Sequence, residues 1–273
     1  MWTSCSRGRA ALAPLFAAAL LVAAGCSTPV LSIEDEKKLG EQFAKEARRE
    51  LDFVGDDLVR RYIENLGKRI IDAAGPQPLQ YRFYVVDDPE LNAFAAPGGH
   101  VYVQTGLIMA ADNLSELAGV IGHEVGHVAL RHIARNYYRQ RGTGILYQLG
   151  AIALAIFFPS PIATGGQLAG QLAAMAYLNT FSRDAERESD QFAVEVLPRA
   201  GIHPIGLATF FETLLEQGGG RPPAFLSSHP ATDERIANAR AAIAAADLPG
   251  TLAIEDDGKL EIIQRRIQLL TGQ

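Results

Sequence analysis

Cysteine is almost absent from this chain of 273 residues, and the two that it has, Cys5 and Cys26, both lie close to the N-terminus. The rest of the chain cannot form a disulfide framework, so its fold must be held by packing and by metal. Positive charge is also scarce, because 25 Lys and Arg residues face 31 Asp and Glu residues, for a net charge of −6. Binding to nucleic acid needs a basic surface, so we expect no nucleic-acid partner.

Internal repeats are missing as well. The chain shows no period of roughly 34 residues, which would indicate stacked helical pairs. Removing the first 25 of 273 residues, as argued next, leaves 248, which is enough for one sizeable core. We therefore expect a single domain over residues 33–273.

The N-terminus has the pattern of a bacterial lipoprotein signal. Two arginines precede an apolar run at residues 10–24, and Ala-Ala-Gly leads into Cys26. This predicts a signal peptide over residues 1–25, a lipid on Cys26 and a lipidated tether at 26–32. An uncleaved membrane anchor is the alternative, although the run is short for a membrane span. Because Ser27 follows rather than an aspartate, similarity to known lipoproteins implies an outer-membrane anchor with the body facing the periplasm.

The most informative motif is H-E-x-x-H, formed by His123, Glu124 and His127 within an apolar run at residues 117–130. Residues four apart share one face of a helix, so both imidazoles can point at one ion. Zn²⁺ accepts imidazole nitrogen ligands and keeps a fourth position open for water in catalytic sites. The carboxylate of Glu124 could take a proton from that water. A chance match on an amphipathic helix is the alternative.

Hydrophobic periodicity predicts a mostly helical α+β fold. Short β-branched and aromatic runs predict a small sheet or hairpin beside the H-E-x-x-H helix, with a Pro-Gly-Gly link between its last two strands. We expect helices at 33–51, 57–73, 113–139, 182–197, 204–216, 232–245 and 259–270, and strands at 81–86, 92–96 and 101–104.

Residues 141–178 permit several interpretations. The stretch 145–158 is almost wholly apolar, and proline and glycine residues interrupt the sequence after it. It is too short to cross a bilayer comfortably. A buried helix, a flap over the active site and an insertion that contacts lipid all remain open.

A hydrolytic zinc site needs a third protein ligand besides the two histidines. The richest source of carboxylates is the stretch 182–190, where Glu186 and Asp190 would share one helix face and Glu188 would point roughly the opposite way. One face can thus offer Glu186 to the metal and Asp190 to the ring N–H of a ligating histidine. A solvated helix with Arg–Glu pairs is the alternative.

Several segments read like those of a known enzyme family. They are Asn-Ala-Phe-Ala-Ala-Pro-Gly-Gly at 92–99, Val-Tyr-Val at 101–103, Thr-Gly-Leu at 105–107 and the approach to the H-E-x-x-H motif at 116–122. The family's pattern S-R-x-x-E-x-x-A-D falls on 182–190, with Ser189 replacing the usual alanine. In these segments the chain, from about residue 33 to residue 245, resembles the zinc metallopeptidase family of HtpX, BepA and the CAAX prenyl protease (peptidase family M48).

The resemblance implies a zincin-like metallopeptidase fold and one Zn²⁺ per chain. It implies that His123, His127 and Glu186 are the metal ligands, that Glu124 is the general base, and that Asp190 orients a ligating histidine.

The remaining histidines have less certain roles. A segment at 228–235 resembles the family pattern S-H-P-x-T-x-x-R, whose histidine can occupy the open metal position in BepA-type members. His229 is therefore a candidate reversible fourth ligand or transition-state hydrogen-bond donor, unless it only shapes a turn. We expect His132 to pack or hydrogen-bond near the site, about 140° around the helix from His127, and His100 and His203 to be surface or loop residues.

These observations favour a lipid-anchored zinc metalloendopeptidase of the bacterial envelope. An extended peptide would add to an edge strand that includes Asn92, Ala93, Phe94 and Ala95, and main-chain pairing of this kind suits unfolded or misassembled envelope proteins. One alternative is a chaperone-like outer-membrane assembly factor with a structural or latent zinc site. Another, less favoured, is a zinc amidase that acts on cell-wall peptides. The sequence leaves the oligomeric state open.

Overall fold

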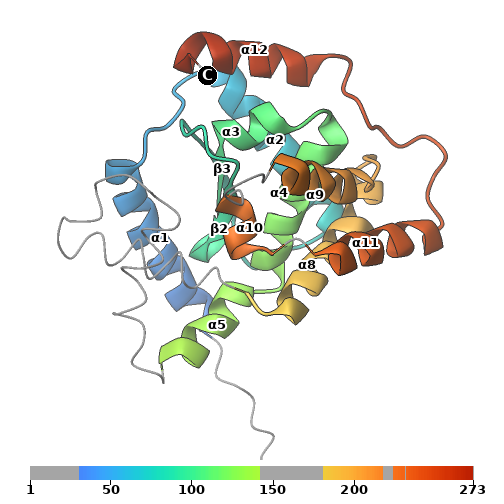
Figure 1. The fold of residues 1–273 in the computed structure, drawn as a ribbon. Helices are drawn as coiled ribbons and strands as arrows, with labels where there is room; N and C mark the ends of the chain where they lie inside the picture. The colour runs from blue at the N-terminus through green and yellow to red at the C-terminus, as the bar shows by residue number, and fades with distance from the viewer. Residues whose placement is uncertain (1–30, 142–180, 218–223, 231, 273) are drawn as a thin grey trace, which may run out of the picture.

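The computed structural model describes residues 31–141, 181–217, 224–230 and 232–272, which form helices around a small sheet (Figure 1). The expected α+β, mostly helical class is confirmed. The helices are α1 (Ile33–Glu50), α2 (Asp57–Ala74), α3 (Thr105–Ala110), α4 (Leu114–Ala129), α5 (His132–Arg141), α8 (Arg183–Arg199), α9 (Gly206–Gln217), α10 (Ala224–Ser228), α11 (Asp233–Ala245) and α12 (Lys259–Thr271). Cys26 and the stretch 145–158 lie outside the described residues.

The helices begin where side chains can cap their free backbone N–H groups. Ser32 caps α1, Asp56 caps α2 and Asn113 caps α4. Ser182 and Thr232 do the same for α8 and α11. Each side-chain oxygen accepts a hydrogen bond from a backbone N–H two or three residues further on, which satisfies a donor that has no partner within the helix.

The sheet has three strands, β1 (Arg82–Val86), β2 (Ala93–Ala96) and β3 (His100–Gln104). They lie in the order β1-β3-β2, with β1 parallel and β2 antiparallel to β3. The short 3₁₀ turn η1 (Pro97–Gly99) joins β2 to β3, and Gly98 and Gly99 adopt φ angles of 77° and 93° there. A Cβ atom on Gly99 would lie 2.2 Å from the carbonyl oxygen of Gln80, so this turn requires glycine.

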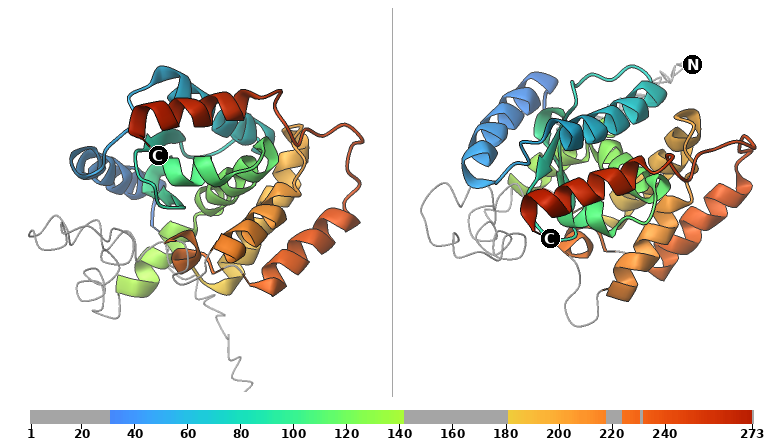
Figure 2. Two further views of the ribbon diagram at one scale, coloured as in Figure 1. Left: turned by 45° about the horizontal axis from the view of Figure 1, so that its top comes forward. Right: turned by 90° about the horizontal axis from the view of Figure 1, so that it is seen from above.

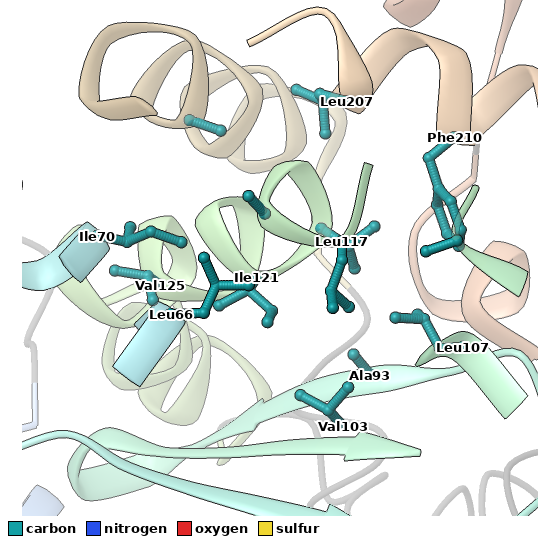
Figure 3. Packing of buried hydrophobic residues seen from close by; sticks show 14 of the residues in the cluster. Leu66, Ile70, Ala93, Val103, Leu107, Leu117, Ile121, Val125, Leu207 and Phe210 are labelled. Atoms are coloured by element: carbon teal, nitrogen blue, oxygen red, sulfur yellow. The ribbon is translucent and has the colours of Figure 1, made fainter. Parts of the chain in front are cut away.

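Alternating strand residues pack in opposite directions, as the pleat dictates. On one face, Phe94 and Tyr102 join Phe43 of α1, and Tyr102 stacks between Tyr84 and Phe94 at centroid distances of 4.8 and 4.9 Å. The opposite face joins the main core. Figure 3 shows Ala93 and Val103 of the sheet, Leu66 and Ile70 of α2, Leu117, Ile121 and Val125 of α4, and Leu207 and Phe210 of α9.

Helix α4 therefore runs through the middle of the molecule. The sheet and α1 lie on one side of it and α8, α9 and α11 lie on the other, an order that two further views preserve (Figures 1 and 2). Every residue of α4 from Leu114 to Val128 is buried. Among the residues that the structure describes, none of the helices combines the length and the apolar composition that crossing a membrane requires.

Three sequence expectations about elements need correction. The helix expected at 113–139 is two helices, α4 and α5. The helical conformation is interrupted at Leu130 and Arg131, and Arg131 has a left-handed φ of 56°. Pro198 lies in the last turn of α8 instead of ending the helix before it. Helices α3 and α10 were not expected, since each has only 6 or 5 residues and too few positions to show a period.

Candidate metal centre

Helix α4 presents His123 and His127 on one face, as the four-residue spacing requires. Their Nε2 atoms lie 3.0 Å apart, and both side chains are fully buried. Helix α8 supplies Glu186 from the opposite side. Its carboxylate oxygens lie 3.5 Å from His123 Nε2 and 3.4 Å from His127 Nε2.

His229, which follows α10, completes the group. Its Nδ1 atom lies 3.2 Å from His123 Nε2 and 3.1 and 3.2 Å from the two oxygens of Glu186. One donor atom from each of the four residues, His123, His127, Glu186 and His229, lies within 4.8 Å of all the others. His123 and His127 come from α4, Glu186 comes from α8 more than 50 residues further along the chain, and His229 follows α10. Only the tertiary fold brings these four residues together.

The spacing of these donors fits a metal ion. Nitrogen and oxygen ligands at about 2.0–2.1 Å from Zn²⁺ in a tetrahedron lie roughly 3.3–3.4 Å from one another. The nearest donor pairs here are 3.0 to 3.5 Å apart. Three imidazoles and one carboxylate, all buried, are also a typical set of ligands for a divalent transition metal. The described residues can therefore hold a metal ion at this point.

Glu124 lies beside this group and is itself fully buried. Its Oε1 atom is 3.5 Å from Nε2 of His229, and the backbone N–H of Ala95 also faces the carboxyl group. Burial raises the pKa of Glu124, and the neighbouring His229 and His123 only partly oppose that shift. A carboxyl group whose pKa is raised by burial is better able to accept a proton and pass it on.

Asp190 contacts His123 on the side of the ring that faces away from the other three donors. Its Oδ1 atom lies 2.8 Å from Nδ1 of His123, which leaves Nε2 of that ring directed at the other donors. Burial alone would raise the pKa of Asp190, but hydrogen bonds from Arg235 and His123 outweigh it and lower the pKa. The carboxylate therefore stays ionised.

Arg235, which sequence reasoning left without a role, joins the carboxylates behind the centre. Its guanidinium donates to both oxygens of Asp190 at 2.7 Å, and its Nη1 lies 2.9 Å from Oε2 of Glu186. It also lies over the ring of Phe211, at 4.6 Å from the centroid. Burial acts to raise the pKa of Glu186, but its interactions with His229 and His123 outweigh burial and lower the pKa well below its usual value. The only sequence feature that pointed to Arg235 was the arginine that ends the family pattern at 228–235.

Two of the three other histidines lie where the sequence predicted, and one does not. His132 lies against the centre, with its Nδ1 atom 2.9 Å from Nδ1 of His127, and so hydrogen-bonds near the site as expected. His203 lies in the turn before α9, also as expected. The expectation for His100 is wrong, because it is the first residue of β3, only 1% exposed, and contacts the hydroxyl of Tyr84 at 3.1 Å.

The candidate substrate strand lies next to this centre. Ala93, Phe94 and Ala95 belong to β2, at one edge of the three-stranded sheet, and Asn92 is the buried residue before it. Strand β2 contacts α4, and the backbone N–H of Ala95 interacts with the carboxyl group of Glu124.

Comparison with known proteins adds independent evidence. The sequence model of peptidase family M48 matches residues 57–243, which include every donor described above. The chain is 35% identical over 214 residues to a protein of Escherichia coli (strain K12) named beta-barrel assembly-enhancing protease, covering 77% of this chain and 44% of that protein. It is 36% identical to metalloprotease LoiP of the same organism, covering 60% and 62% of the two chains. It is 30% identical to mitochondrial metalloendopeptidase OMA1 of Schizosaccharomyces pombe, covering 76% and 60%. The chain thus spans less than half the length of the assembly-enhancing protease that it matches.

Proposed function

Because the chain belongs to peptidase family M48, we propose that it is a zinc-dependent metalloendopeptidase of the bacterial cell envelope. The observation that carries the proposal is the convergence of His123, His127 and Glu186 on one point, with the buried carboxyl group of Glu124 beside it. The proposed ligands are these three residues, with one Zn²⁺ per chain. Bound zinc supplies Lewis-acid chemistry, which makes water a better nucleophile and polarises a peptide carbonyl.

The residues of the chain carry out the remaining chemistry. Glu124 takes a proton from the attacking water and passes it to the leaving amine, for which a pKa raised by burial suits it. Asp190 holds Nδ1 of His123, so that the ring keeps the orientation and tautomer that a ligand needs. The edge strand β2 pairs through its backbone with an extended segment of substrate, along Asn92, Ala93, Phe94 and Ala95.

His229 acts as a reversible fourth ligand in this proposal. Its Nδ1 atom stands with the other donors, in the place that a catalytic site leaves open for water. The described arrangement then corresponds to a resting state. In the active state the ring of His229 withdraws and can donate a hydrogen bond to the oxyanion of the tetrahedral intermediate.

Main-chain pairing demands little sequence specificity, so the substrates that we propose are unfolded or misassembled envelope polypeptides. A lipid on Cys26 would anchor the enzyme to the outer membrane, facing the periplasm. The name of the Escherichia coli relative refers to β-barrel assembly, which supports the proposal that the substrates are proteins of the outer membrane.

The substitution Glu124→Gln tests the proposal. It keeps the size of the side chain and removes the base, so the variant should bind one zinc ion as the parent does and should lose cleavage of casein. Cleavage at the parental rate by a pure preparation of the variant would contradict the assignment. His229→Ala should retain zinc on three ligands. The variant loses the resting ligand, which favours cleavage, and the oxyanion donor, which slows it, so a faster rate would mean that release from the resting state dominates.

A second candidate function is that of an assembly factor whose zinc stabilises the fold. The observation in its favour is the set of four protein donors, since structural zinc sites are closed in this way. Rescue of an envelope defect by the Glu124→Gln protein would favour this function, whereas rescue that needs Glu124 would favour the protease.

A further inference from the structure

The backbone takes a strained path directly after the metal-facing helix. Helix α4 ends at Ala129, and Arg131 adopts a φ of 56°, which residues other than glycine rarely adopt. The side chain of Arg131 contacts a distant part of the chain. The guanidinium of Arg131 donates to Oε2 of Glu36 at 3.0 and 2.8 Å and to the carbonyl oxygen of Leu31. Backbone strain of this kind is often associated with a functional site.

The strained residue brings His132 back to the metal centre. In an uninterrupted helix, residue 132 would lie about 140° around the axis from residue 127. The break starts a new helix at His132, and its Nδ1 atom lies 2.9 Å from Nδ1 of His127. That nitrogen of His127 is on the opposite side of the ring from Nε2, which faces Glu186 and His123.

A carboxylate on α8 extends this contact into a chain of hydrogen bonds. Nε2 of His132 lies 2.9 Å from Oε2 of Glu188, and Arg135 donates to the same oxygen at 3.0 Å. A carboxylate can only accept, so the hydrogen of a neutral His132 ring lies on Nε2. Its Nδ1 then has a lone pair, which accepts from the N–H at Nδ1 of His127. His127 is left with its lone pair on Nε2, the nitrogen that faces the other donors.

We propose that His132 and Glu188 are positioning residues that fix His127 in the tautomer able to bind the metal. The proposal rests on the metal site of the proposed function. His123 receives the equivalent support directly from Asp190, at 2.8 Å. Glu188 points away from the face of α8 that bears Glu186 and Asp190, and the imidazole of His132 spans the gap. Helix α8 thus supports both histidines of the motif, one directly and one through His132.

The variant Glu188→Ala tests the outer end of this chain. Glu188 is 48% exposed, so the substitution removes the acceptor without opening the core. Loss of such outer partners typically weakens metal binding by roughly 10- to 100-fold. We expect the zinc dissociation constant of the full chain, measured by competition with a chromophoric chelator, to rise by about tenfold. Glu195→Ala is the matched control, because Glu195 is an exposed acceptor on α8 that contacts Gln191 instead.

Substitutions of His132 test the inner end. His132→Leu fills similar space without an acceptor and should weaken zinc binding by about 10- to 100-fold. His132→Asn places a side-chain oxygen close to the position of Nδ1 and should restore most of the affinity. The nitrogen NMR spectrum of the zinc-loaded parent should show a single tautomer of His132, with hydrogen on Nε2, and Glu188→Ala should show a mixture of tautomers.

Two results separate this inference from the proposed function. If the parent protein itself fails to bind zinc, the metal site is wrong. If the parent binds zinc, and Glu188→Ala has the same zinc affinity and the same His132 tautomer as Glu195→Ala, then the positioning role of the hydrogen bonds through His132 is refuted. Denaturant unfolding separates a positioning role from a general loss of stability. A positioning role lowers only the part of the unfolding free energy that depends on zinc, whereas a general loss also lowers the unfolding free energy of the metal-free variants.

Discussion

At the scale of single residues, Arg235 balances the charges that the metal centre gathers. Glu186 and Asp190 are ionised and buried within reach of one another, and the guanidinium of Arg235 contacts both. With a divalent ion bound and Glu124 ionised, three negative charges face three positive ones. Removing one partner from such a buried group leaves an uncompensated charge, which is far more costly than loss of an exposed ion pair.

His100 makes the stability of the protein depend on pH. Burial and, to a smaller extent, the nearby charge of Arg82 together lower its pKa to about 4. A histidine in the unfolded chain has a pKa near 6.5, so the unfolded state binds more protons between about pH 4 and pH 6.5. This contribution to stability is therefore complete at pH 7 and is lost as the pH falls.

The expected size is about 2 kcal/mol of unfolding free energy between pH 7 and pH 5. Urea unfolding at both pH values, in the presence of chelator, measures this loss. Between pH 7 and pH 5 the parent should lose about 2 kcal/mol more unfolding free energy than His100→Gln does. The substitution can lower stability at both pH values, so the test lies in the change with pH. Equal changes with pH in the two proteins would contradict the assignment.

At the scale of elements, two glycines of α4 differ in how closely a neighbouring helix approaches them. A Cβ atom on Gly119 would lie 2.6 Å from the backbone nitrogen of Leu207 in α9, which is too close. A Cβ atom on Gly122, about one turn further on, would lie no closer than 3.4 Å to Ala193 and 3.6 Å to Leu197 of α8, which is ordinary van der Waals contact. Both positions are buried in the same helix, so they form a matched pair.

We expect Gly119→Ala to lower the free energy of unfolding by about 1–3 kcal/mol, because α9 must move away from α4. Gly122→Ala should be neutral or stabilising by up to about 1 kcal/mol, since alanine favours the helix over glycine. Urea unfolding of both variants measures the contrast. Equal losses in the two would mean that the close approach of α9 is not what requires glycine at residue 119.

Most elements were predictable because their signals are local. Ser32, Asp56 and Ser182 cap helices at the expected starts, and the Pro-Gly-Gly turn lies between the expected strands. The break after α4 was not predictable in this way. Arg131 at the break contacts Glu36, which is 95 residues away in the sequence, and the periodicity of the local sequence continues through the break.

At the scale of the whole molecule, the candidate metal site joins parts of the chain that are otherwise separate. His123 and His127 come from α4, Glu186 from α8, and His229 from the segment after α10. An ion that binds only the folded state stabilises it, by about 2.7 kcal/mol when free metal is 100 times the dissociation constant. Removal of the metal should therefore loosen the contact between these elements.

Dialysis against a chelator should lower the melting temperature, and added zinc should restore it. His127→Asn serves as the control, because a protein with a damaged site has little of this stabilisation to lose. A decrease of the same size in the parent and in the variant would show that the chelator acts somewhere else.

The site was predictable only where one helix contains the pattern. The spacing of His123 and His127 indicates a shared face, and the same argument selects Glu186 with Asp190. The contacts of Arg235 and the chain through His132 to Glu188 cross between helices, so no spacing reveals them. His100 was misplaced because a polar residue after two glycines usually indicates a turn, whereas here it begins a buried strand.

The enclosure of α4 also limits how this protein can diverge. From Leu114 to Val128 the helix has no side in contact with water, so a larger or smaller side chain there changes the packing against a neighbour at most positions. A change of side-chain volume there has to be matched in α8, α9 or the sheet before it can persist. Evolution along this helix should therefore proceed by paired, compensating replacements, while the solvent side of α12 accumulates single ones.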